Sequence, residues 1–414
     1  MRRSLAVLGP GLGAGILGAG IGLVAGCYDT RVTDEDAFIP PRSDAAPSAD
    51  AAVLDAYRAP VPRDVDLLIV MDDSSSMAEE HAAFVAQLPR TIQILASGDF
   101  DADGISDVPP VRSMHVGVVT TDMGAGPHAG VPSCARGLGG DGILRRTSAT
   151  TTPPCHADYP SGVFEYLRDR GDSTDDFAAT VSCVARVGTG GCGFEQPLEA
   201  GLKAVTPTGI PAWVRDDLGE VRFVSIDGIP DSEGGQGDRA NSGFLRSDSI
   251  LAIHVISDED DCSVREYGLF VASDPRFSGV PSGLRCDTFG DPSGGFVFPV
   301  DRYVNGLLRL RRDPRDLVLA VTAGTPIETE ALAARGDFAG VLASPNMIPR
   351  RDEAGTGLLP SCSSADGAAF PPVRMVQVAA GLSSMGANVG MSSICSTSTF
   401  GVGLIEPLYA ALRR

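Results

Sequence analysis

The fold is decided by residues 65–77, which read Val-Asp-Leu-Leu-Ile-Val-Met-Asp-Asp-Ser-Ser-Ser-Met. Residues 65–71 form an almost continuous apolar run, which is typical of a strand buried on both faces of a parallel sheet. A helical pattern follows, in which Phe84, Leu88, Ile92 and Leu95 recur on one face. Pro89 inside this pattern predicts a kink or a break in the helix.

Further apolar runs and helical patterns alternate along the rest of the chain. Runs similar to the first strand lie at residues 114–120, 250–256 and 317–321. Helical patterns lie at residues 176–186, 194–205, 302–312 and 403–413. Because strands alternate with helices, we expect an α/β fold with an open, mostly parallel, doubly wound (Rossmann-like) sheet.

Long stretches rich in Gly, Pro, Ser and Asp interrupt this alternation at residues 124–172, 206–243, 262–300 and 324–370. Loops of this length are uncommon in compact domains and usually have a function or cross-links of their own. Most of the cysteines lie within these stretches or at their edges. We therefore expect one domain over residues 63–414, with long disulfide-stapled insertions, and not two domains.

The charge of the chain excludes one class of partner. There are 33 basic and 53 acidic residues, which give a formal net charge of -20, and no basic run offsets this excess locally. Nucleic-acid binding is therefore not expected, because it needs a basic surface. An acidic excess suits a protein that holds divalent cations or stays soluble at a surface, although a merely solvated acidic exterior explains it equally well.

The amino terminus has the pattern of an export signal. Arg2 and Arg3 precede an uncharged stretch, which ends in Val24-Ala25-Gly26-Cys27. This pattern resembles a bacterial lipoprotein signal. The resemblance implies that residues 1–26 are removed, that Cys27 is acylated, and that the protein is exported and anchored through lipid in the bacterial envelope, in the outer membrane. The alternative is an uncleaved transmembrane helix. Residues 27–62 read as a flexible tether rich in Asp, Ala, Pro and Ser.

Eight cysteines follow Cys27, and an even number in an exported chain predicts four disulfides. Sequence alone does not fix their connectivity. We expect sequential pairing, because each pair then brackets one loop-rich segment: Cys134–Cys155, Cys183–Cys192, Cys262–Cys286 and Cys362–Cys395. No pair of cysteines has the spacing of a zinc site.

Asp72, Ser74 and Ser76 fit a D-x-S-x-S pattern directly after the first strand. Carboxylate and hydroxyl oxygens on one tight loop suit Mg²⁺ or Ca²⁺, and hydroxyl ligands leave the metal enough positive charge to attract an acidic group. An open α/β sheet also binds ligands at the carboxyl ends of its strands. The pattern in this position resembles the metal-ion-dependent adhesion site of a von Willebrand factor A domain.

That resemblance implies two further metal ligands, an Asp after a later strand and a Thr from a second loop. Asp258 matches the Asp, although Ser257-Asp258-Glu259 departs from the usual T-D-G of the family. Thr189 matches the Thr more loosely, because the usual second threonine is missing. The alternatives are a plain glycine turn at Thr189 and a helix cap or a solvated acidic turn at Asp258.

The resemblance covers most of residues 64–414. Besides the lipoprotein signal and the DDSSSM motif, it includes VVTTDMG (118–124), GFEQPL (193–198), SDEDDC (257–262) and SIC (393–395). Together these motifs are similar to surface lipoproteins with a von Willebrand A-like domain found in myxobacteria and their relatives. The likeness implies an architecture more strongly than a role.

A second acidic cluster consists of Asp99, Asp101, Asp103 and Asp107. Carboxylates at alternate positions around the Gly104 turn are typical of EF-hand-like and thrombospondin-type calcium loops. Pro110 stands where an EF-hand has its bidentate Glu, so a full EF-hand is not supported. We expect a structural Ca²⁺ here, the alternative being a solvated Asp-Gly turn.

The functional expectation is a binding module, not an enzyme. Metal held by Asp72, Ser74, Ser76, Thr189 and Asp258 would grip an acidic group of a protein or glycan ligand. The alternative is a structural envelope protein with a vestigial metal site and loop-mediated assembly. Ser75 or Ser76 with His81 or His254 offers a nucleophile and a base, but no G-x-S-x-G elbow accompanies them.

Overall fold

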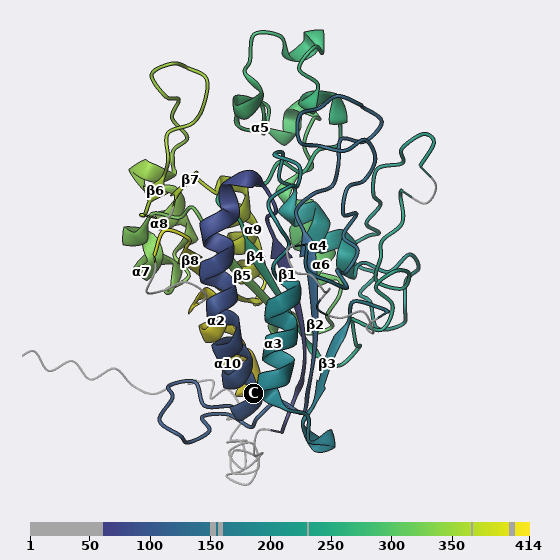
Figure 1. Ribbon diagram of the computed structural model, residues 1–414, viewed down its shortest axis with the longest axis vertical. Coiled ribbons are helices and arrows are strands. Elements are labelled where there is room, and N and C mark those ends of the chain that lie inside the picture. Colours follow the sequence, from purple (N-terminus) through teal and green to yellow (C-terminus); the bar gives the residue numbers. More distant parts are fainter. Residues whose placement is uncertain (1–60, 150–154, 156–159, 230–231, 366, 397–401) are drawn as a thin grey trace, which may run out of the picture. The chain divides into compact units, whose positions relative to one another are not determined.

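The computed structural model describes residues 61–149, 155, 160–229, 232–365, 367–396 and 402–414 (Figure 1). The expected signal segment at residues 1–26, the acylation site Cys27 and nearly all of the expected tether lie outside these residues. Within them, no helix combines the length and the apolar character needed to cross a membrane.

A six-stranded sheet forms the centre of the fold, with the strand order β3-β2-β1-β4-β5-β8. All neighbouring strands are parallel except β3, which runs antiparallel to β2 at one edge. The strands are β1 (Asp64–Met71), β2 (Ser113–Thr120), β3 (Phe164–Leu167), β4 (Ile250–Ile256), β5 (Leu317–Ala323) and β8 (Asn388–Ser393). The expectation of an open, mostly parallel α/β sheet is confirmed.

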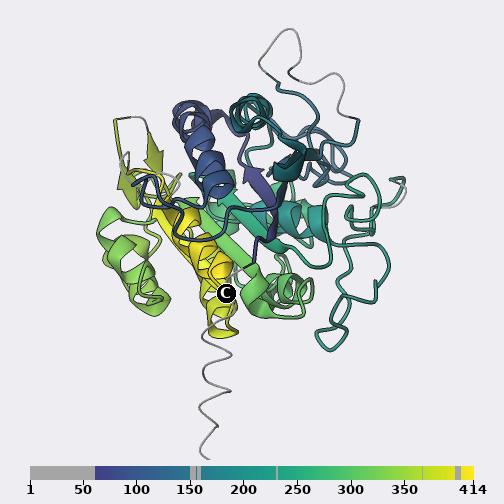
Figure 2. The same cartoon turned by 90° about the horizontal axis from the view of Figure 1, so that it is seen from below.

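Helices cover both faces of the sheet, as Figure 2 shows from below. One face packs against α2 (Ala78–Ser97), α3 (Thr174–Val184) and α10 (Val402–Leu412). The other face packs against α4 (Pro197–Val205), α6 (Val300–Leu308) and α9 (Val373–Ser384). Alternate residues of β1 serve the two layers: Leu67 and Ile69 lie in the first core, Leu68 and Val70 in the second. This two-sided burial explains why β1 reads as an unbroken apolar run.

The helix α2 continues through Pro89, so the break that Pro89 predicted does not occur. Its apolar face, which includes Phe84, Leu88 and Ile92, is buried on the sheet, and this packing outweighs the lost backbone hydrogen bond. The helix ends at Gly98, whose φ is 72° and whose N–H donates to the Ile94 carbonyl at 2.8 Å. A Cβ there would lie 2.1 Å from the Val108 carbonyl oxygen, so this cap requires glycine.

Two strands of the central sheet are not apparent from the sequence. The edge strand β3 lies inside the expected loop 124–172, and at four residues it is too short to show a pattern. The strand β8 contains Gly390, Ser392 and Ser393 and buries only its last three residues, so it lacks an apolar run. Helix α9 and three short helices, α5 (Arg285–Thr288), α7 (Glu330–Ala333) and α8 (Phe338–Leu342), were likewise not expected, nor was the two-stranded β6 (Cys362–Ser363) and β7 (Ala368–Ala369).

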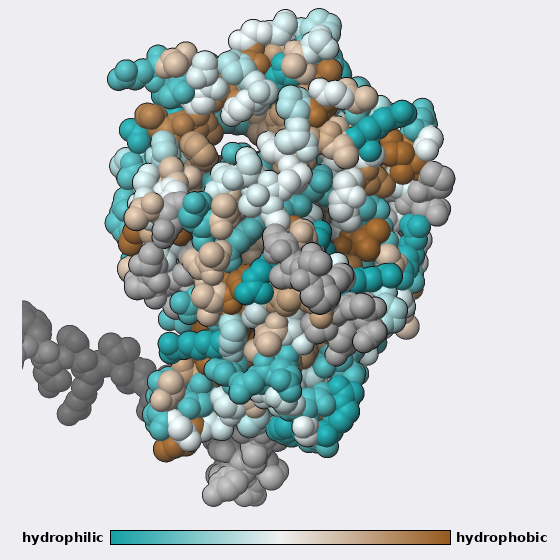
Figure 3. Space-filling view, in the orientation of Figure 1, coloured by the Kyte–Doolittle hydropathy of each residue, from teal (hydrophilic) through white to brown (hydrophobic). Residues whose placement is uncertain are grey.

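The loop insertions have a small core of their own. Val131, Phe194, Tyr267, Phe270 and Phe277 are buried together with the cysteines of two disulfides. Phe194 stacks on Phe270 with 4.2 Å between the ring centroids. Figure 3 shows that hydrophilic residues dominate much of one outer face and that its apolar patches are small and separated.

The four disulfides join Cys134 to Cys192, Cys155 to Cys183, Cys262 to Cys286 and Cys362 to Cys395. Sequential pairing is therefore right for the last two pairs and wrong for the first two. The reason is that the segment before Cys134 packs on the segment after Cys192: the Gly193 N–H donates to Ser133 Oγ at 3.0 Å. Cys183 lies on α3, where Cys155 reaches it.

Candidate functional site

The strand order reverses between β1 and β4, because β2 and β3 continue on one side and β5 and β8 on the other. In open α/β sheets such a reversal leaves a crevice at the carboxyl ends of the two strands, and ligands bind there. The loop after β1 begins at Asp72, and the loop after β4 begins at Ser257. Both acidic loops therefore lie at the reversal point.

The carboxylate of Asp72 is fully buried and holds the two loops together. Its Oδ1 accepts the Ser74 N–H at 2.8 Å, and its Oδ2 accepts the Ser257 hydroxyl at 2.6 Å. Burial raises the pKa of Asp72, while the bonds from Ser257 and Ser74 act in the opposite direction. Ser74 Oγ and Ser76 Oγ lie 3.0 Å apart, with Ser74 buried and Ser76 exposed.

Asp258 lies across the crevice from this loop. The Ser76 hydroxyl lies close enough to its carboxyl group to lower the pKa of Asp258, so the third residue of the D-x-S-x-S pattern stands beside the expected later Asp. Asp258 Oδ1 is buried and has no hydrogen-bond partner among the described residues. Burial, together with the charges of Asp72 and Glu259, raises the pKa of Asp258 to about 8. The structure thus brings Asp72, Ser74, Ser76 and Asp258 together.

Thr189 is placed differently. Its loop is pressed against the site, because the Gly191 N–H donates to the Asp73 carbonyl at 2.7 Å. A Cβ on Gly191 would lie 2.2 Å from Asp73 Oδ1, so this close approach requires glycine. The side chain of Thr189 itself is exposed and makes no hydrogen bond within the described part of the chain.

Three residues at the crevice were not expected to take part in the site: Glu195 and Thr121, which are buried, and Glu259, which is half-buried. Glu195, just before α4, is 2% exposed, and burial with the charges of Glu259 and Asp72 holds its pKa well above the ordinary value. Burial raises the pKa of Glu259 to about 6. Thr121 follows β2, donates its N–H to the Met71 carbonyl at 3.1 Å, and has a buried hydroxyl without a partner among the described residues. Their position within the motifs VVTTDMG, GFEQPL and SDEDDC was the only available signal.

The two histidines near the motifs serve other contacts. His81 Nε2 donates to the Asp72 carbonyl at 2.5 Å, and burial lowers its pKa. His254 points below the crevice, where its Nε2 lies 2.8 Å from Thr322 Oγ1. Within the described residues, neither ring hydrogen-bonds to Ser75 or Ser76, so neither is arranged as a base for these hydroxyls.

The donor set at the crevice suits a hard divalent cation. It consists of oxygen atoms only, from the Asp72 and Asp258 carboxylates and the Ser74 and Ser76 hydroxyls, which are the ligands that Mg²⁺ and Ca²⁺ prefer. Neither carboxylate forms an ion pair with a basic side chain in the described chain. Buried anions without a counter-charge are costly, and a bound cation would remove that cost.

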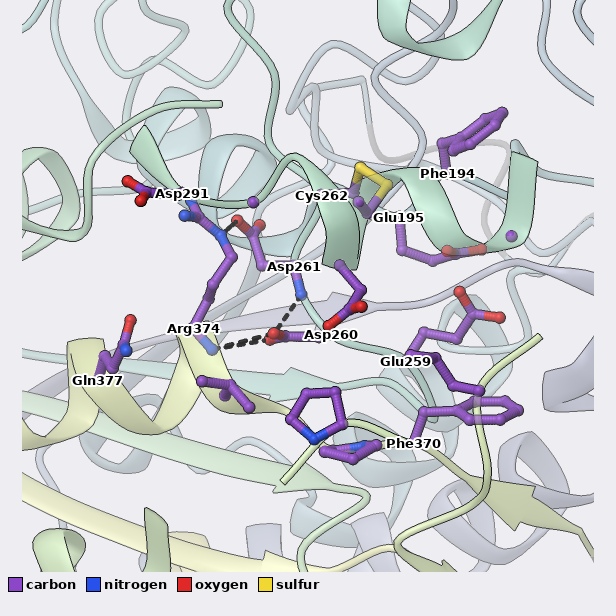
Figure 4. A pocket seen from close by; sticks show the side chains of 18 of the residues that line it. Phe194, Glu195, Glu259, Asp260, Asp261, Cys262, Asp291, Phe370, Arg374 and Gln377 are labelled. Carbon is purple, nitrogen blue, oxygen red and sulfur yellow. Dashed lines mark hydrogen bonds and ion pairs between the residues drawn. A yellow bond between two sulfur atoms is a disulfide. The ribbon is translucent and has the colours of Figure 1, made fainter. Parts of the chain in front are cut away.

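A cavity of about 710 Å³ adjoins the crevice. Glu195 and Glu259 line it, and Figure 4 shows their carboxyl groups close together on one wall. Phe370 also lines it and donates its N–H to the Asp258 carbonyl at 2.8 Å. Because Glu259 directly follows Asp258 in the chain, the wall of the cavity is next to the candidate metal ligand.

The second acidic cluster lies at the far end of α2 from the crevice. Oxygen atoms of Asp99, Asp101 and Asp107 approach within 4.8 Å of one another, so this group could hold a cation. Asp103 does not belong to this group; its Oδ1 accepts the Ile105 N–H at 2.8 Å. A helix of this length separates the two acidic sites by about 30 Å.

The chain was also compared with known proteins. No protein-family model matches it, and no curated protein was found to be similar.

The raised pKa of Asp258 predicts how stability depends on pH. The native carboxyl holds its proton up to about pH 8, whereas the ordinary value is 3.8. The contribution of Asp258 to the free energy of unfolding is therefore full below pH 4 and is lost as the pH rises to about 8. In chelator, the melting temperature of Asp258→Asn should fall less between pH 5 and 8 than that of the wild type. Glu353→Gln, at an exposed carboxylate, is the matched control, and equal pH slopes for all three proteins would contradict the assignment.

Proposed function

We propose that the chain is a von Willebrand A-type lipoprotein, which binds a protein or glycan ligand through a divalent cation at the crevice. One observation carries this proposal: Asp72 and Asp258, buried on either side of the strand reversal, converge on Ser74 and Ser76. The strand order, with its antiparallel edge strand, and the position of the D-x-S-x-S motif after β1 support the von Willebrand A type.

The metal would be held by Asp72, Ser74, Ser76 and Asp258. The resemblance assigns the fifth ligand to Thr189, whose loop lies against Asp73. Bound there, Mg²⁺ or Ca²⁺ would act as an electrophile for an acidic group of the partner. The exposed hydroxyl of Ser76 lies on the side from which a partner can approach, while the buried carboxylates compensate the charge from below.

Anchoring is a separate part of the proposal and rests on the sequence around Cys27. Acylation of this residue, with residues 27–62 as a tether, would hold the domain at the bacterial outer membrane. Ligand binding through the crevice would then occur at a membrane surface, with the domain free to reach partners over the length of the tether.

Substitutions in the crevice test the metal site. Ser76→Ala and Asp258→Asn should each weaken binding of Mg²⁺ or Ca²⁺, measured by calorimetry, about tenfold or more, because the first removes an oxygen ligand and the second removes a negative charge. Ser75→Ala is the matched control, since Ser75 is the exposed neighbour outside the alternating pattern.

Pull-down from envelope extract, in Mg²⁺ or Ca²⁺ and in chelator, tests the function that follows from the site. A partner should be retained by the wild type and by Ser75→Ala in metal, and lost with Ser76→Ala or in chelator. If metal binds but the partner is retained equally in chelator and by Ser76→Ala, the site is vestigial, and the structural envelope protein is the better description.

We also propose a structural Ca²⁺ at Asp99, Asp101 and Asp107. Calcium should raise the melting temperature of the wild type, and Asp101→Asn with Asp107→Asn should remove most of that gain, because both carboxylates belong to the converging group. Glu353→Gln should respond like the wild type. A calcium response that survives in the double variant would assign the effect to another site.

The anchor is tested at the amino terminus of the mature protein. Mass spectrometry should find an acylated Cys27 as the first residue, and Cys27→Ser should abolish both acylation and removal of residues 1–26. Recovery of the wild type with the leading segment still attached would contradict the lipoprotein proposal.

A further inference from the structure

The cavity beside the crevice is built from several separate segments of the chain. Gly193 to Glu195 and residues 259–262 form one side, residues 282–291 lie above them, and the segment around Phe370 and Arg374 closes the other side. In Figure 3 the surface is hollowed at the end of the molecule where α5 lies in Figure 1. The volume, about 710 Å³, falls in the usual range for small-molecule sites.

The cavity is held in shape by covalent and polar links. The disulfide between Cys262 and Cys286 ties the upper segment to the loop after β4. The Cys262 N–H donates to the Glu195 carbonyl at 2.8 Å, which joins that loop to the start of α4. Such links between its walls make the cavity a preformed site, and not a gap between mobile loops.

Two of the acidic groups in the wall are already used by the fold. Asp260 accepts the Arg374 N–H at 3.0 Å, at the start of α9. Asp261 accepts Arg374 Nε at 3.2 Å and the Ser263 hydroxyl at 2.6 Å. Figure 4 shows Arg374 turned toward these two carboxylates. Arg374 is the one basic side chain among the described lining residues. Its positive charge is already paired with Asp261.

Glu195 and Glu259 have no basic partner, and their carboxyl groups interact with each other instead. Among the described residues, neither forms an ion pair, although Glu195 is 2% exposed and both carboxyl groups border the cavity. Aromatic rings stand near them, since Phe194 and Phe370 line the same cavity, and in the view of Figure 4 the two carboxyl groups lie between these rings. Carboxylates beside aromatic faces form a typical environment for an organic cation.

Exposed acidic residues that line the cavity also favour a cationic ligand. Asp287, Asp291 and Asp301 line the mouth of the cavity and are exposed. Acidic side chains around an opening raise the local concentration of cations and repel anions. Pro349, Leu358 and Pro371 add apolar lining, so the site offers both a negative wall and a surface for hydrocarbon.

We propose that this cavity binds an organic cation, an ammonium or guanidinium group on an apolar body, with the charged head at Glu195 and Glu259 and the apolar part against Phe370 and Phe194. The head supplies the counter-charge that the fold leaves out, and its N–H groups donate to the two carboxylates. The proposal does not rest on a metal in the crevice.

Calorimetry with the full chain in chelator tests it. The probes are 2-phenylethylamine and the capped dipeptide acetyl-phenylalanyl-arginine amide. Their neutral counterparts are 2-phenylethanol and acetyl-phenylalanyl-glutamine amide. At least one cationic probe should bind about tenfold or more tightly than its counterpart. Binding of the dipeptide alone would identify a basic side chain of a peptide as the ligand, and binding of the amine alone a free small amine.

Variants locate the binding. Glu195→Gln with Glu259→Gln should weaken the cationic probe about tenfold or more, and Phe370→Leu should weaken it less. Glu353→Gln should leave it unchanged, and because the titrations are run in chelator, a metal in the crevice does not contribute to the binding. If the double variant does not fold, Glu259→Gln alone decides, because this residue is only partly buried. Equal affinity for neutral probes, binding that needs Mg²⁺ or Ca²⁺, or unchanged affinity in the glutamine variants would overturn the proposal.

Discussion

The reversal of strand order between β1 and β4 is the constraint on which the rest of this molecule depends. The two strands are parallel neighbours in register, with Met71 opposite Ile256, and the Asp72 N–H donates to the Ile256 carbonyl at 3.0 Å. Asp72 and Asp258 therefore converge because the sheet ends there, and not because flexible loops meet. The same register buries them, so the fold concentrates negative charge at low dielectric, where it must be protonated, paired or compensated by a cation.

The insertions give this charged edge its surroundings. They pack on one another through their own core, which contains Phe194, Phe270 and Phe277, and disulfides tie them to the loops that follow the strands. An open sheet of this kind forms a crevice at the carboxyl ends of its strands but does not enclose a cavity by itself. Here the added segments build a cavity beside the crevice, and Arg374 with Asp260 and Asp261 fixes the position of its wall. The long loops thus line a cavity that the sheet alone would not form.

Most strands of the central sheet can be predicted from the sequence, but the candidate site can be predicted only in part. Four strands, β1, β2, β4 and β5, are buried on both faces, and their sequences are therefore apolar runs. The edge strands β3 and β8 are less buried, and their sequences have no such run. The pairing of Cys134 with Cys192 and of Cys155 with Cys183 depends on how distant loops pack, and so does the approach of Glu195 to Glu259. The spacing of residues along the chain does not encode this packing. Asp72 and Asp258 were found because they follow readable strands. Glu195 and Glu259 belong to the motifs GFEQPL and SDEDDC, but their place in the wall of a cavity is a tertiary property.

The two proposed sites share one electrostatic environment, because Asp258 and Glu259 are consecutive and Asp72 acts on the charge of Glu195. A cation in the crevice lowers the negative potential in the cavity, and a cation in the cavity lowers it in the crevice, by the same coupling free energy in both directions. Charge alone therefore makes the two cations compete. A partner that offers an acidic group to the metal and a basic group to Glu195 and Glu259 avoids part of this penalty, because its own two charges attract each other. If both proposed sites are used, charge complementarity at this edge would favour a zwitterionic partner over a purely acidic or purely basic one.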